Sequence, residues 1–139
     1  MSHKKDALDM IIEGYGVCTR DGGKEILPAI ECQDGTVISV QGSYYSYCEP
    51  KDNMGQYYLL DIAMSDEIKV PSSWKREDLG DGRTNYGFVP VGDLRRLVEI
   101  HGGVKGFWKG SGNPVPCRKW EEDCRSRGIK PRIYSDRYL

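Results

Sequence analysis

The C-terminal end of the chain contains the residue types best suited to binding an anion. Residues 105–139 hold nine Lys and Arg against four acids, an excess of five positive charges, whereas residues 1–104 carry a net charge of −6. Arginine binds phosphate oxygens two at a time and stacks on flat rings, while tyrosine offers a ring face to a base. The segment therefore predicts a nucleotide-type anion as ligand, and its candidate ligand-binding residues are Arg118, Arg125, Arg127, Arg132, Tyr134 and Arg137. A disordered tail, or a tail that bridges two subunits, would explain the same composition.

Tyrosines cluster a second time, in residues 43–47. In a strand that alternates from Ile38, Tyr44 faces the core, whereas Tyr45 and Tyr47 rise from the polar face. There the two rings could stack on a ligand base or pack against another subunit, and the alternative is cross-strand pairing with a tyrosine of the same sheet. A pyrophosphate flanked by ribose and adenine also needs amide or hydroxyl groups and rings. The predicted ligand-binding set therefore includes Tyr45, Tyr47, Asn85 and Phe88.

The sequence contains no pattern typical of an active site or a metal site. Its five cysteines include no C-x-x-C pair, and neither His3 nor His101 stands at the spacing of a zinc ligand. The glycine-rich stretches match no phosphate-binding loop, and the G-x-S-x-G pattern of a nucleophilic serine is missing. We therefore expect a protein that binds without catalysis and without a cofactor. Duplex DNA fits less well as a ligand, because the net charge of the chain is −1.

Apolar periodicity predicts a helix, a hairpin and a third strand in the first half of the chain. Three apolar residues recur at helical spacing in residues 6–13, and glycines follow them. Strand-like runs at residues 25–32 and 36–48 are joined through an Asp-Gly pair, which favours a hairpin turn. Residues 56–64 predict a third strand with Tyr57 on its outer side. The predicted core side of that strand consists of Tyr58, Leu60, Ile62 and Met64.

The second half of the chain predicts one long loop and two helices. Residues 65–85 are rich in polar residues, Gly and Pro, which indicates a surface excursion with a short strand at residues 68–70. Pro90 opens the clearest helix of the chain, and two glycines close it. A further helix is predicted over residues 117–127, with Trp120 on its core side. Together these elements predict an α+β fold, a small twisted antiparallel sheet with two or three helices.

The size and hydropathy of the chain predict one soluble domain. At 139 residues and 38% apolar composition, the chain can bury a core of its own. We expect residues 1–104 to form a core of sheet and helices, and residues 105–139 to form a basic helix and tail. No stretch approaches the roughly 20 apolar residues that a membrane span needs, and the first residues do not read as a signal peptide. A cytoplasmic protein is therefore expected.

Three blocks of the sequence resemble small proteins encoded by bacteriophages. The resemblance spans roughly residues 30–104. It rests on a strand pattern and on a later segment that starts a helix with YGFVPV and ends with HGG. The blocks begin at Thr36, Tyr57 and Tyr86 and read TVISVQGSYYSYCEPK, YYLLDIA and YGFVPVGDLRRLVEIHGGV. The chain looks like the Thoeris anti-defence sponge family.

That resemblance implies a non-catalytic, oligomeric phage protein, often a ring-like hexamer. Members sequester cyclic ADP-ribose isomers, which bacterial TIR-domain defence enzymes produce, and some also hold cyclic trinucleotides. No family site residue can be carried over onto a position of this chain. Two alternatives stay open: a protein that inhibits a host defence enzyme by direct binding, through the acidic residues 61–81 or the basic tail, and a nucleotide-processing enzyme.

Overall fold

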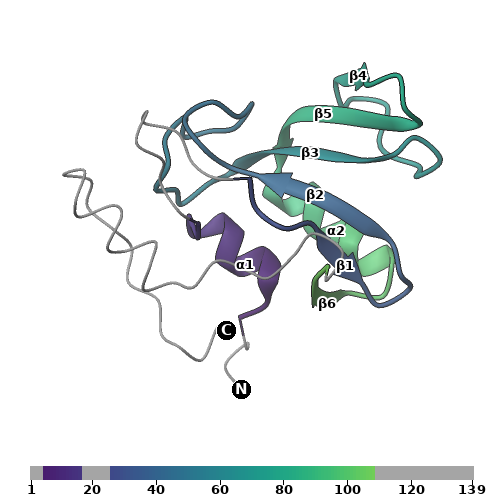
Figure 1. Cartoon of the computed structure of the whole chain (residues 1–139), viewed down its shortest axis with the longest axis horizontal. Helices are drawn as coiled ribbons and strands as arrows, with labels where there is room; N and C mark the ends of the chain where they lie inside the picture. The colour runs from purple at the N-terminus through teal and green to yellow at the C-terminus, as the bar shows by residue number, and fades with distance from the viewer. Residues whose placement is uncertain (1–4, 17–25, 109–139) are drawn as a thin grey trace.

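The computed structural model describes residues 5–16 and 26–108 of the chain. Within these residues lie two helices and one six-stranded antiparallel sheet, with the strand order β4-β5-β3-β2-β1-β6 (Figure 1). This is an open α+β fold, and the predicted fold class is confirmed. The elements are α1 Ala7–Ile12, β1 Ile30–Cys32, β2 Val37–Gln41, β3 Leu59–Ser65, β4 Arg76–Asp78, β5 Arg83–Pro90, α2 Val91–Ile100 and β6 Val104–Phe107.

Both predicted helices in the described part are confirmed. The side chain of Asp6 accepts the backbone N–H of Asp9, and the side chain of Asp9 accepts the backbone N–H of Asp6, which fixes the start of α1. In α2 the residues Leu94, Leu97 and Val98 are buried against the sheet. Two glycines at positive φ follow α2 and end it. The helix predicted over residues 117–127 lies outside the described residues.

Both helices cover the same face of the sheet. Arg95 of α2 forms an ion pair with Asp9 of α1, which places the two helices side by side. The strand residues that share the core with the helices alternate along each strand, as in β3, where Leu60, Ile62 and Met64 are buried. The opposite face of the sheet, called the open face below, carries mostly polar residues of β2, β3 and β5: Ser39, Gln41, Asp61, Ala63, Ser65, Arg83 and Asn85.

The predicted hairpin is confirmed, but both of its strands are shorter than the predicted runs at residues 25–32 and 36–48. Strands β1 and β2 pair antiparallel, with Ile30 opposite Ile38. Strand β2 ends at Gln41 because Gly42 lies under the ring of Tyr57, where a β-carbon would stand 2.6 Å from the ring. The chain leaves the sheet there, so the prediction that Tyr44 is buried is wrong, and its side chain is 53% exposed.

The predicted core side of β3 is correct for three residues and wrong for the first. Tyr58 is 62% exposed, whereas Tyr57 is only 2% exposed. The reversal arises because β3 begins at Leu59, so strand alternation does not reach the two tyrosines. The hydroxyl of Tyr57 donates to the carbonyl of Asp52 at 2.6 Å, which holds this ring inside the loop.

The surface excursion predicted over residues 65–85 is shorter, because residue 65 belongs to β3 and residues 83–85 to β5, and its short strand is not where the sequence predicts it. The short strand is β4, which pairs with β5, and residues 68–70 are not in a strand. Trp74 packs edge-on against Tyr86 at 5.6 Å and donates from its indole N–H to Asp93 of α2, so it closes the core at this end. None of the helices in the described residues is long and apolar enough to cross a membrane.

Candidate functional site

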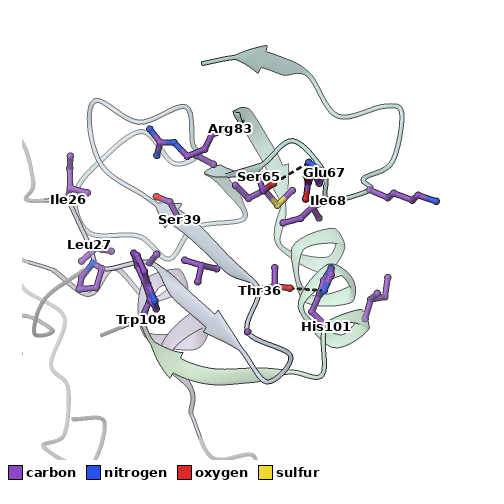
Figure 2. Close-up of a pocket in the computed structure, with 18 residues that line it drawn as sticks. Ile26, Leu27, Thr36, Ser39, Ser65, Glu67, Ile68, Arg83, His101 and Trp108 are labelled. Carbon is purple, nitrogen blue, oxygen red and sulfur yellow. Dashed lines mark hydrogen bonds between the residues drawn. The ribbon is translucent and has the colours of Figure 1, made fainter. Parts of the chain in front are cut away.

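A groove of about 1310 Å³ lies where β2 and β3 separate (Figure 2). The ladder between these strands ends at the pair Ser39 and Ala63. Beyond that pair, Val37 of β2 and Ser65 of β3 stand on opposite sides of the groove. Since β3 turns away at Ser65, whose carbonyl accepts the N–H of Ile68 at 3.2 Å, the two strands cannot close the gap.

Two segments from distant parts of the sequence form the apolar wall of the groove. Gln41 on the open face holds the segment beginning at Ile26, because its side chain exchanges two hydrogen bonds with the backbone of Leu27, at 2.9 and 3.0 Å. Trp108 is held by its backbone N–H, which donates to the carbonyl of Ala29 at 2.7 Å. Its indole remains 40% exposed and lines the groove together with Ile26 (Figure 2). The wall therefore offers one flat ring for stacking.

The polar side of the groove is suited to an anion. Arg83 lines it, and the carboxylate of Asp81 accepts from its Nε at 3.0 Å and lies 2.9 Å from one terminal nitrogen. This hydrogen bond lowers the pKa of Asp81, so the pair is charged, and the remaining guanidinium N–H groups can bind a further acceptor. Lys69 and Glu67 also line this side, so its two cations are balanced by two carboxylates, and it is the free N–H groups of Arg83 that suit an anion. The hydroxyls that line the groove belong to Thr36, Ser39 and Ser65.

A cluster around His101 lies at the end of the groove that the β1–β2 turn and the end of α2 form. The Nδ1 of His101 lies 3.0 Å from the hydroxyl of Thr36 (Figure 2). The same nitrogen lies 2.7 Å from the carboxylate of Asp34. The pKa of Asp34 is lowered to about 2. The largest cause is the hydrogen bond from the hydroxyl of Thr36, followed by those from the backbone N–H of Thr36 and from His101. The cluster joins the β1–β2 turn to the end of α2, and it thereby fixes one end of the groove.

The Asp34 cluster predicts a loss of stability in acid. Because the pKa of Asp34 falls from 3.8 to about 2 on folding, its contribution is complete above pH 4 and disappears as the pH falls towards 2. Replacing Asp34 with Asn removes this contribution. Urea unfolding between pH 2 and pH 6 should therefore show a steeper acid loss in the wild type than in Asp34→Asn. Parallel pH profiles for the two proteins would contradict the assignment.

None of the four predicted ligand-binding residues that the structure describes lines the groove: Asn85 and Phe88 belong to β5, and Tyr45 and Tyr47 to the loop after β2. Asn85 stands next to Ala63, a groove residue, in the register of β3 and β5. The rings of Tyr47 and Phe88 are 5.9 Å apart, and those of Tyr44 and Tyr45 are 5.1 Å apart. We call these four rings, Tyr44, Tyr45, Tyr47 and Phe88, the aromatic surface. The other predicted residues, Arg118, Arg125, Arg127, Arg132, Tyr134 and Arg137, lie outside the described residues.

A β-bulge places Phe88 next to Tyr47. Opposite the single residue Asp61, strand β5 has two residues, Gly87 and Phe88, and Phe88 adopts φ +55°. The backbone N–H of Phe88 donates to the carbonyl of Tyr47 at 2.8 Å. A β-carbon at Gly87 would stand 2.9 Å from that of Tyr47, so the glycine permits this close contact. A left-handed phenylalanine costs about 1–3 kcal/mol, and such strain concentrates at functional sites.

The carboxylate of Asp61 lies behind the aromatic surface. It accepts the backbone N–H of Tyr47 at 3.1 Å on Oδ2, while its buried Oδ1 has no hydrogen-bond partner in the described part of the chain. Burial raises the pKa of Asp61, and the N–H of Tyr47 and the amide of Asn85 oppose the shift. This negative group favours a cation over a phosphate at the aromatic surface.

Sequence reasoning missed the groove itself. Trp108 and Arg83 belong to no motif, and neither has a neighbour in the sequence at a functional spacing. They line the same groove only because β6 pairs with β1 at one edge of the sheet while β5 pairs with β3. The best available signal was the aromatic pair that follows Gly106, of which Trp108 is exposed while Phe107 packs against the core.

Comparison with known proteins adds no identification. Neither a protein-family model, nor a curated protein, nor a solved structure matches the chain.

Proposed function

We propose that this protein binds a small nucleotide-type anion in the groove and holds it without converting it. One observation carries the proposal: the groove combines an exposed indole, a guanidinium and three hydroxyls on one concave surface. Stacking on an indole suits a base, guanidinium groups suit phosphates, and hydroxyls suit a ribose. All of these are binding groups.

The resemblance to the Thoeris anti-defence sponge family supplies the ligand class of this proposal. On that basis the ligand is a cyclic nucleotide immune signal, either a cyclic ADP-ribose isomer or a cyclic oligonucleotide. The protein then acts in the cytoplasm of an infected bacterial cell as an anti-defence sponge, and it assembles as a homo-oligomer such as a hexamer. The volume of the groove, about 1310 Å³, is sufficient for a ligand of this size.

The proposal is tested by ligand depletion. The purified full-length protein is incubated with cyclic ADP-ribose isomers and cyclic oligonucleotides, removed by filtration and heated, and the released material is analysed. We expect one class of nucleotide to be depleted and then recovered intact. Release of a changed product would instead show an enzyme, and no depletion of any nucleotide would overturn the proposal.

Arg83 gives the site-specific test. Replacing Arg83 with Gln should weaken ligand binding about 10- to 100-fold, because a charge-assisted hydrogen bond contributes about 1.5–3 kcal/mol. The matched control is Arg96→Gln, since Arg96 is also an exposed arginine paired with a nearby aspartate, but lies on α2 outside the groove. Titration calorimetry should find the control unchanged. Equal affinity of the two variants would remove the groove from the binding site.

A further inference from the structure

The loop of residues 42–58 presents the three tyrosines of the aromatic surface in a fixed conformation, and β5 presents Phe88. The loop projects from the end of the sheet opposite the β1–β2 turn (Figure 1). The side chain of Asn53 accepts the backbone N–H of Tyr44 at 2.7 Å, and the hydroxyls of Ser43 and Ser46 are hydrogen-bonded at 2.6 Å. Rigid tyrosines among serines are typical of antibody loops, in which they give large contact areas at a low entropic cost.

The face of the Tyr47 ring already holds a cation. The Nζ of Lys51 lies 6.0 Å from the centroid of this ring, within the range of a cation–π contact. Lys51 is the only Lys or Arg among residues 42–58, which also contain Glu49 and Asp52. Asp61 behind Tyr47 adds a third carboxylate, against Lys51 of the loop and Lys75, which lies beside Phe88. This environment attracts a second cation and repels a phosphate.

We propose that the aromatic surface docks a protein partner through an arginine side chain, which replaces Lys51 over the ring of Tyr47. Arginine fits better than lysine, because its planar guanidinium stacks on a ring and can donate to a carboxylate at the same time. The strained backbone of Phe88 keeps a second ring beside Tyr47 for this contact. The surface is independent of the nucleotide groove, so either proposal can fail without the other.

The test uses two short synthetic Gly/Ser peptides, one carrying arginines and the other lysines at the same positions. Each is titrated into the full-length protein, and binding is followed by NMR. We expect the arginine peptide to bind about fivefold more tightly than the lysine peptide, and the Tyr45→Ser/Tyr47→Ser variant to bind it about tenfold more weakly than the wild type. The variant should fold normally, because both rings are at least half exposed and the contact of Tyr47 with Asp61 uses the backbone.

Lys51 provides a test with the opposite sign. Lys51→Gln empties the ring face, so this variant should bind the arginine peptide about threefold more tightly than the wild type. The groove variant Arg83→Gln should bind it as the wild type does. Equal binding of the two peptides, or unchanged affinity in Lys51→Gln, would overturn the proposal. Binding of an oligothymidylate or a cyclic nucleotide that is lost in Tyr45→Ser/Tyr47→Ser but kept in Arg83→Gln would assign the rings to a nucleotide and also overturn it.

Discussion

Replacing Gly14 with Ala is expected to destabilise the protein by about 2–5 kcal/mol. Gly14 follows α1 at φ +96°, and a β-carbon there would stand 1.9 Å from the carbonyl oxygen of Met54. That oxygen belongs to the backbone of the loop, so a side-chain movement cannot relieve the clash. Overpacking costs about 1–3 kcal/mol, and a β-carbon at positive φ adds about 1–2 kcal/mol. Urea unfolding measures the sum.

Gly35→Ala is the matched control for this prediction. Gly35 has nearly the same backbone conformation, φ +89°, but a β-carbon there would have no neighbouring atom within 4 Å. This variant should therefore lose only the conformational part, about 1–2 kcal/mol. If the two variants were equally stable, the close approach of α1 to the loop of residues 42–58 would not exist as described.

Replacing Tyr57 with Ala should also cost about 3–5 kcal/mol, because it removes a large side chain from the core. The ring of Tyr57 lies under Gly42 and near Gly55, and its hydroxyl donates to the carbonyl of Asp52. Its backbone N–H donates to Ile12 of α1 at 2.7 Å, so the residue links the helix to the loop. Thermal and urea unfolding should both show the loss.

Tyr58→Ala distinguishes the described structure from the simple strand alternation that the sequence predicts. Simple alternation places Tyr58 in the core, whereas the structure places its ring in solvent. Because exposed substitutions usually change stability by less than about 0.5 kcal/mol, Tyr58→Ala should unfold almost as the wild type does. A large loss in Tyr58→Ala with a small loss in Tyr57→Ala would restore the alternating pattern and contradict the described loop.

The spacing of apolar residues correctly predicted the buried face of an element where that face follows the regular period of the helix or strand. Leu94, Leu97 and Val98 follow the helical period, and Ile62 and Met64 follow the strand period, so the faces of α2 and β3 were predicted correctly. The ends of strands depend instead on contacts with distant residues. Strand β2 stops where the Tyr57 ring covers Gly42, a contact across fifteen positions of the sequence that no local pattern reveals.

The candidate site was less predictable than the fold. The sequence singled out tyrosines and arginines by composition, and it brought Tyr47, Phe88 and Asn85 into one proposed set, although it did not indicate the bulge that places Phe88 beside Tyr47. Trp108 and Arg83 could not be assigned to one groove from the sequence, because their common placement depends on the pairing of β1 with β6. The prediction that the arginines of residues 118–137 bind the ligand stays a prediction.

The short strand β4 has a consequence for the behaviour of the protein in concentrated solution. It forms one edge of the described sheet, and its three residues, Arg76, Glu77 and Asp78, are all charged and exposed. A strand from another molecule could extend the sheet there only by removing water from these charges. The charged edge therefore opposes edge-to-edge aggregation of the protein at high concentration.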